Sequence, residues 1–147
     1  MQRRPSAPAA SPRSPVILVD GTNVYGSRPD GWWRNRPQAA RRLAAELDQL
    51  CRITGLACTL VLDPMPRNGK SPASTSHVTV VTAPRRRRDA ADDTIVARVA
   101  ALPDPTRAFV YTSDRRLSAR LAALGARTAG AGVLLSRIDL VCRSGAG

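Results

Sequence analysis

The acidic residues that could do chemistry stand at the ends of short apolar segments or at the start of a helical pattern. The chain has 11 Asp and Glu residues, and four aspartates occupy such positions. If the apolar segments are strands of a parallel sheet, their carboxyl ends meet along one edge, where ligands bind in open α/β sheets. We therefore expect four carboxylates to converge there, namely those of Asp20, Asp63, Asp92 and Asp114.

Carboxylates held close together repel one another and raise each other's pKa unless a cation is present. Mg²⁺ takes oxygen ligands and keeps several waters, so it suits a few carboxylates from separate strand ends. Each acid also has a structural interpretation, because Asp-Gly is common in turns and Asp92, Asp93 and Asp114 could cap helices. We interpret the set as a divalent-cation site, with capping as the alternative for any single member.

Asp92 occupies a position in the expected helix that is typical of a buried residue. It precedes Ile95, Val96 and Val99 on the apolar stripe of the expected helix, whereas Asp93 is turned away from that stripe. Polar residues accompany the other acids. Asn23 could orient a carboxylate or a water, Gly21 allows a tight turn, and three hydroxyls could cap helices or donate from behind the acids: Thr22, Thr112 and Ser113.

The elements that must position these residues alternate between strands and helices. Four apolar segments are too short for ordinary helices and predict strands, whereas three longer segments place apolar residues on one helical face. This alternation implies crossover connections, and therefore an α/β fold in which helices cover both faces of a parallel sheet. The expected strands span 16–19, 57–62, 78–82 and 108–112, and the expected helices span 37–54, 91–102 and 115–124.

The chain ends are expected to lie outside the domain. Residues 1–15 are rich in Pro, Ser and Arg and predict a disordered basic arm, residues 16–142 form the expected domain, and residues 143–147 are expected to fray. The three cysteines are scattered, and neither a secretory signal nor a membrane-length apolar run is present. We expect a reduced cytoplasmic protein without a membrane partner.

The charge of the chain favours a polyanionic partner. There are 23 Lys and Arg residues, which gives a formal net charge of +12, and nearly all are arginine. Arginine matches phosphate oxygens with a planar fork, and neutralised phosphates release counterions. An arginine-rich coding bias is the alternative explanation, so charge supports nucleic acid without proving it.

Several other classes of protein lack their required residues here. A haloacid-dehalogenase phosphatase needs an aspartate at the position of Leu18, and a receiver domain needs paired acids and a late lysine. Neither a Gly-Lys-Ser/Thr phosphate loop nor a dinucleotide-binding glycine fingerprint occurs. His77 is the single histidine and is interpreted as a strand-edge residue.

Five motifs in order, VDGTNV, VLD, AADDTI, VYTSD and GAGVLLSRIDL, closely resemble the NYN nuclease domains of the YacP type, which belong to the PIN-like superfamily. The resemblance runs from Val16 to about Val141. It implies a three-layer fold with strand order 3-2-1-4-5. It also implies an endoribonuclease that uses one or two Mg²⁺ or Mn²⁺ ions and leaves 5′-phosphate and 3′-hydroxyl ends.

Carried onto this sequence, the resemblance implies roles for individual residues. Asp20, Asp92 and Asp114 match the metal-binding acids, and Asn23 matches their polar partner, so these four are the expected catalytic residues. Asp63 and Asp93 are expected to be auxiliary. Residues 67–76 do not align with the family, and an arginine run replaces the usual loop before AADDTI, so the substrate preference stays open.

RNA, expected to be single-stranded, is the implied partner. Arginines beside the acids could grip its phosphates, although charge runs are often only solvated surface. Two tryptophans could stack on bases or cover the edge of the core. A non-catalytic RNA-binding adaptor and a PIN-type toxin are the alternatives, and association with the ribosome is left open. The candidate RNA-binding residues are Arg85, Arg86, Arg87, Arg88, Arg115, Arg116, Trp32 and Trp33.

Overall fold

The fold was obtained as a computed structural model that describes residues 14–84 and 89–145. Three segments lie outside the described residues, so the expectations for them stay predictions: residues 1–13 of the expected basic arm at 1–15, the run Arg85–Arg88, and residues 146–147. Within the described part of the chain, no helix is both long and apolar enough to cross a lipid bilayer.

A five-stranded sheet forms the centre of the molecule, and all of its strand pairs are parallel. Its strand order is β3-β2-β1-β4-β5, which confirms the order implied by the resemblance. The strands are β1 (Val16–Asp20), β2 (Cys58–Leu62), β3 (Val78–Thr82), β4 (Ala108–Tyr111) and β5 (Arg127–Ala129).

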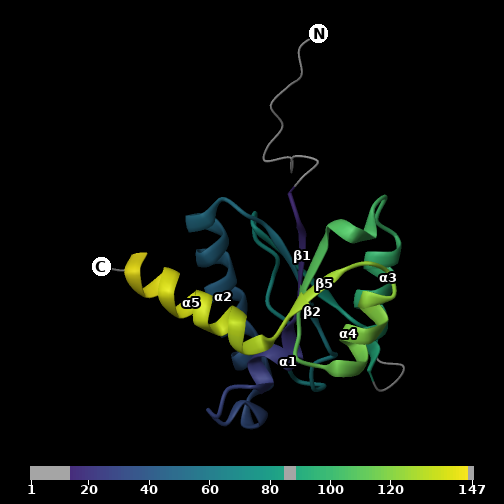
Figure 1. The fold of residues 1–147 in the computed structure, drawn as a ribbon. Helices are drawn as coiled ribbons and strands as arrows, with labels where there is room; N and C mark the ends of the chain where they lie inside the picture. Colours follow the sequence, from purple (N-terminus) through teal and green to yellow (C-terminus); the bar gives the residue numbers. More distant parts are fainter. Residues whose placement is uncertain (1–13, 85–88, 146–147) are drawn as a thin grey trace.

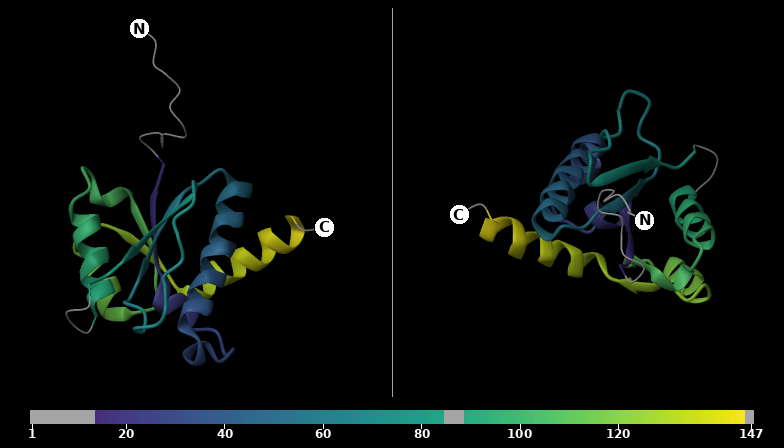
Figure 2. Two further views of the ribbon diagram at one scale, coloured as in Figure 1. Left: turned by 180° about the vertical axis from the view of Figure 1, so that it is seen from behind. Right: turned by 90° about the horizontal axis from the view of Figure 1, so that it is seen from above.

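Helices cover both faces of the sheet, so the expected three layers are confirmed (Figures 1 and 2). One face carries α1 (Gly21–Gly26), α2 (Arg36–Thr54) and α5 (Ala131–Gly145), and the other carries α3 (Ala90–Ala100) and α4 (Arg115–Ala122). Two short 3₁₀ helices, η1 (Trp32–Arg34) and η2 (Pro105–Arg107), lie in the connections.

The two faces follow from the alternation of side chains along the central strand. Val19 packs in the core under α1, α2 and α5, whereas Leu18 packs in the core under α3 and α4. A strand buried on both faces needs apolar residues at successive positions, which explains the uninterrupted apolar run before Asp20.

Helix α2 begins and ends at residues suited to those positions. The Asn35 side chain accepts a hydrogen bond of 3.1 Å from the Gln38 backbone, Pro37 stands in the first turn, and Gly55 ends the helix in the left-handed conformation at φ 74°. The expected helix at 37–54 is therefore confirmed to within one residue.

Besides the two 3₁₀ helices, the structure contains three elements that the sequence interpretation did not assign. Helix α1 begins at Gly21, immediately after β1, where a turn was expected. Strand β5 has only three residues, and helix α5 follows it. Helix α5 includes residues 143–145, which were expected to be frayed.

Gly21 is required for space rather than for an unusual backbone angle. A Cβ atom there would lie 2.6 Å from Leu62 Cδ2, 2.7 Å from Leu60 Cδ1 and 2.9 Å from the Val61 carbonyl oxygen. We predict that Gly21→Ala lowers the free energy of unfolding by about 1–3 kcal/mol, as overpacking typically does. Gly132→Ala is the control, because nothing lies within 4 Å of its added Cβ. Equal urea midpoints for both variants would contradict this account.

Candidate active site

The order of the strands reverses at β1. After β1 the chain forms β2 and β3 on one side, and it returns to form β4 and β5 on the other side. In such sheets the crevice at the carboxyl ends of the strands beside this reversal is the usual ligand site. Asp20 is the last residue of β1, and Thr112 follows the last residue of β4.

Asp20 is a buried acid at this crevice. The residue is 3% exposed, and its Oδ2 accepts a hydrogen bond of 2.8 Å from the Thr112 hydroxyl. Burial raises the pKa of Asp20 to about 6, and repulsion from Asp63 and Asp114 acts in the same direction, against the hydrogen bonds from Thr112 and the Asn23 backbone. A negative charge is therefore costly at this position without a cation.

Asp92 lies in the first turn of α3 and is partly buried. Burial is the largest cause that raises the pKa of Asp92 to about 7, followed by repulsion from Asp20 and Asp114 and then from other acids. The structure thus brings Asp20 and Asp92 within electrostatic range of each other and of two further sequence-predicted acids, Asp63 and Asp114. We call these the acidic cluster: Asp20, Asp63, Asp92 and Asp114.

Two members of the acidic cluster also bind helix amides. Asp114 Oδ1 accepts hydrogen bonds from the backbone N–H groups of Arg116 and Leu117, at 2.9 and 3.0 Å, and so caps α4. Asp63 Oδ1 accepts a bond of 3.3 Å from the Ala91 N–H at the start of α3. The capping alternative therefore holds for Asp114, together with its place in the acidic cluster.

Hydroxyl and amide groups tie the strand ends together behind the acids. Thr112 Oγ1 donates to Asp20 and accepts from the Asp114 N–H at 3.1 Å. Asn23 Oδ1 accepts a bond of 2.8 Å from the Ser113 N–H. The Ser113 hydroxyl in turn accepts a bond of 2.8 Å from the Ala131 N–H at the start of α5.

Thr22 makes the corresponding link on the other side of β1. Its Oγ1 accepts a hydrogen bond of 3.1 Å from the Asp63 N–H. Thr22, Thr112 and Ser113 therefore join the ends of β1, β2 and β4 and the start of α5, and they set the positions of the acids. The hydrogen bond between Ser113 and the start of α5 could not be predicted, because the sequence interpretation did not assign α5.

The structure does not bring Asp93 into the acidic cluster. Asp93 Oδ1 forms an ion pair of 2.9 Å with Arg120 Nη1, which joins α3 to α4. Asp89, which directly precedes α3, contributes to the repulsion that raises the pKa of Asp92. Its φ of 61° places it in the left-handed region, which Asp tolerates better than most residues.

The acidic cluster fits a divalent cation in charge and donor type, because its raised pKa values arise from burial and mutual repulsion that a cation would relieve. Within residues 14–84 and 89–145, however, no three His, Cys, Asp or Glu side chains are grouped as a ready ligand set. This arrangement is compatible with an ion such as Mg²⁺, which is commonly held by one or two carboxylates and keeps several waters.

His77 lies at the opposite end of the sheet. Its carbonyl oxygen accepts a hydrogen bond of 3.0 Å from the N–H of Cys58, the first residue of β2. Its Nδ1 lies 3.6 Å from Asp48 Oδ1. The expected position beside a strand is confirmed, and the imidazole takes no part in the crevice.

The model of the YacP-like NYN domain matches residues 17–144. The chain belongs to this family. Two crystal structures of Rae1 (YacP) from Bacillus subtilis resemble the NYN domain described above. A tryptophan-to-leucine mutant has a TM-score of 0.73 and 24% identity and covers 88% of this chain and 78% of that chain. The other structure has a TM-score of 0.72 and 23% identity over 88% and 76% of the respective chains. No curated protein matches the chain.

Membership of the YacP-like NYN family indicates a PIN-like domain of the ribonuclease type. The surface beside the acidic cluster of this NYN domain is basic. Arg115 and Arg116 are exposed in the first turn of α4, directly after Asp114. Two positively charged residues therefore follow Asp114 directly along the chain.

The two tryptophans of the NYN domain have different environments. Trp32 is partly buried, packs against the core and contacts Tyr25 edge to face, with 5.6 Å between ring centroids. Trp33 is 60% exposed, and the guanidinium of Arg34 lies 5.9 Å from its ring centroid. Trp32 covers the edge of the core, which leaves Trp33 as the candidate for stacking on a base.

The two roles of Asp114 in the NYN domain can be separated by substitution. Asp114→Ala removes the cap of α4 and the charge, whereas Asp114→Asn removes the charge but retains an oxygen for the amides of Arg116 and Leu117. We predict that Asp114→Ala is less stable than Asp114→Asn by about 1 kcal/mol in urea unfolding. If the two variants unfold at the same urea concentration, the observed cap contributes nothing to the stability of the protein.

Proposed function

We propose that the chain is a divalent-metal-dependent endoribonuclease that hydrolyses RNA to 5′-phosphate and 3′-hydroxyl ends. The observation that carries this proposal is the acidic cluster, in which burial and repulsion raise the pKa of Asp20 to about 6 and that of Asp92 to about 7. Such perturbed acids concentrate at functional sites. Their position at the carboxyl ends of the strands in a YacP-like NYN domain supports the same proposal.

Asp20, Asp92 and Asp114 are the residues proposed to hold Mg²⁺ or Mn²⁺. Bound there, the ion would polarise the scissile phosphate and help a water to attack in line. The protein's own contribution is placement. Thr112 holds the Asp20 carboxylate through its hydroxyl, and Asn23 ties α1 to the loop after β4 through Ser113.

The basic surface next to the acidic cluster supports RNA as the substrate. Arg115 and Arg116 would contact phosphates adjoining the scissile bond, and Trp33 would stack on an unpaired base, a contact worth about 1–3 kcal/mol in single-strand binders. Single-stranded RNA is therefore the proposed substrate class. The run Arg85–Arg88 lies outside the described residues, and its predicted role in binding RNA rests on its charge alone.

The proposal predicts cleavage of a single-stranded RNA by the purified protein with Mn²⁺ and no cleavage with EDTA. Asp92→Asn should reduce the rate by about 10²–10³-fold, the range typical for loss of one group that stabilises transition-state charge. Asp139→Asn removes the same charge from the exposed surface of α5 and should cleave as the wild type does. Cleavage by Asp92→Asn at the wild-type rate, or cleavage by the wild type in EDTA, would contradict metal-dependent catalysis by these acids.

Cleavage and binding assays separate the adaptor alternative from the proposed nuclease, and the toxin alternative needs a further measurement. An RNA-binding adaptor would retain RNA in Mn²⁺ without cutting it, and its affinity would be insensitive to Asp92→Asn. A toxin ribonuclease would cut in the same way, so co-purification with a neutralising partner separates it from a processing or decay enzyme.

A further inference from the structure

We propose that Cys51 and Cys58 are a redox-reactive thiol pair that peroxides convert to an intramolecular disulfide. Both residues are free cysteines and lie in the core under α1, α2 and α5. The pair is separate from the acidic cluster. Cys58 is the first residue of β2, whereas Asp63 follows the last residue of that strand.

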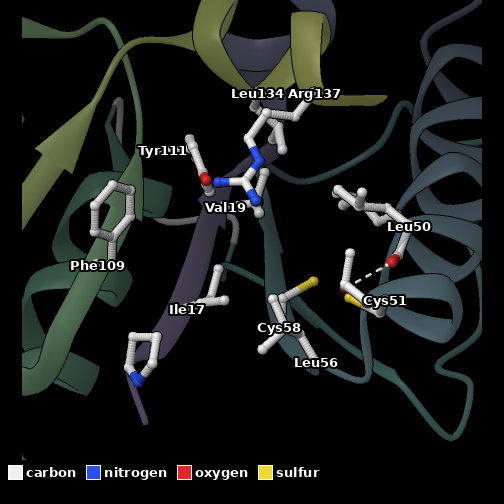
Figure 3. Close-up of a pocket in the computed structure, with 13 residues that line it drawn as sticks. Ile17, Val19, Leu50, Cys51, Leu56, Cys58, Phe109, Tyr111, Leu134 and Arg137 are labelled. Atoms are coloured by element: carbon white, nitrogen blue, oxygen red, sulfur yellow. Dashed lines mark hydrogen bonds between the residues drawn. The ribbon is translucent and has the colours of Figure 1, made fainter. Parts of the chain in front are cut away.

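The turn between α2 and β2 brings the two cysteines together. Cys51 lies on the buried face of α2, and Gly55 ends that helix in the left-handed conformation at φ 74°. The Leu56 N–H then donates a hydrogen bond of 3.0 Å to the Cys51 carbonyl, so the chain folds back before β2 begins. In Figure 3 the sulfur atoms of Cys51 and Cys58 face the same space between the helix and the strand.

A cavity gives small molecules a route to both thiols. Its volume is about 220 Å³, it lies between the sheet, α2 and α5, and both cysteines line it (Figure 3). Cys51 and Cys58 are only 4% and 7% exposed, but Leu56 on the same cavity wall is 36% exposed. Hydrogen peroxide is close to water in size, so a cavity of this volume can admit it.

The contact between the thiols links their ionisation. A hydrogen bond from the Cys58 thiol lowers the pKa of Cys51, and the same contact, together with burial, raises the pKa of Cys58. In the proposed reaction the thiolate of Cys51 attacks the peroxide and the Cys58 thiol resolves the sulfenic acid, and the same disulfide results if the two roles are exchanged. Cys142 differs from both. Its Sγ lies 3.8 Å from the Glu46 carbonyl, and burial raises its pKa.

The reaction is balanced with hydrogen peroxide as the oxidant. The Cys51 thiolate attacks one peroxide oxygen, the O–O bond breaks, and Cys51 becomes a sulfenic acid as hydroxide leaves. The Cys58 sulfur then attacks the Cys51 sulfur, an S–S bond forms, and the sulfenic oxygen leaves as water after protonation. Overall, the two thiols lose two protons and two electrons, and one hydrogen peroxide is reduced to two waters.

The test treats the full-length native protein with hydrogen peroxide and measures thiols, intact mass and crosslinked peptides. We expect the number of titratable thiols to fall from three to one, a mass two hydrogens lower, and a single crosslinked peptide joining Cys51 to Cys58. Dithiothreitol should restore all three thiols. Cys142→Ser should form the same crosslink, whereas Cys51→Ser and Cys58→Ser should not.

Peptide mapping of the wild type decides the proposal even if a cysteine variant fails to fold. A crosslink to Cys142, a crosslink between two molecules, or oxygen added to separate sulfurs would overturn it. So would thiols that resist peroxide in the native protein. None of these outcomes depends on RNA cleavage, so they are distinguishable from a failure of the proposed nuclease function.

Discussion

Asp20→Asn is expected to abolish metal-dependent RNA cleavage and, at the same time, to stabilise the metal-free protein. The two effects have one cause. Asp20 is 3% exposed, and burial together with repulsion from Asp63 and Asp114 disfavours its charged form. Asn has nearly the same shape and retains an oxygen that can accept the Thr112 hydroxyl bond, so the substitution removes mainly the charge.

The expected gain in stability follows from the pKa of Asp20. Burial raises this pKa from 3.8 to about 6, and each unit corresponds to about 1.4 kcal/mol, so the gain above pH 7 is about 1–3 kcal/mol. The folded pKa is the higher one, so the difference between wild type and Asp20→Asn should grow as the pH rises through 6 and vanish below about 4. Urea unfolding in EDTA at several pH values measures it. A less stable Asp20→Asn at pH 8 would contradict the account.

Mn²⁺ is expected to stabilise the wild type strongly at pH 8 and very little at pH 5. The metal and protons compete for the same carboxylates, and burial raises the pKa of Asp20 to about 6 and that of Asp92 to about 7. A pH of 5 is about one unit below the pKa of Asp20 and about two units below that of Asp92. If both must ionise, the affinity for Mn²⁺ should fall by up to roughly a thousandfold.

Without metal, the stability of the protein should fall, rather than rise, as the pH increases. Both acids have pKa values raised above that of the unfolded chain, so they contribute stability below about pH 4 and lose that contribution as the pH rises through 6 and 7. Thermal unfolding with Mn²⁺ and with EDTA between pH 5 and 8 tests both trends. A stabilisation by Mn²⁺ that is the same at pH 5 and pH 8 would place the ion elsewhere.

The sequence predicted the parts of the fold that depend on long periodic segments. The uninterrupted apolar run of β1 and the stripe of α2 are strong patterns, and both elements lie within one residue of the prediction. Strand β5 is too short to give a pattern of its own, with three residues and no fully buried one. Helix α1 is only six residues long, and its first residues resemble a common turn.

The convergence of the acids was predictable because strand ends in a parallel sheet share an edge. The hydrogen bonds around them were not. Ser113 binds the start of α5, and Asp93 turns to Arg120 on α4, and both contacts depend on how separate elements pack. The helical periodicity of the sequence correctly separated Asp92, which joins the acidic cluster, from Asp93, but it could not identify the partner of Asp93.

Binding of Mn²⁺ to the metal-free protein at pH 8, followed by calorimetry or by the resonance signal of free Mn²⁺, tests the central claim most directly. The account predicts saturable binding by the wild type and by Asp139→Asn, and loss of that binding in Asp20→Asn and Asp92→Asn. Equal binding by all four proteins, or no binding by the wild type, would contradict it.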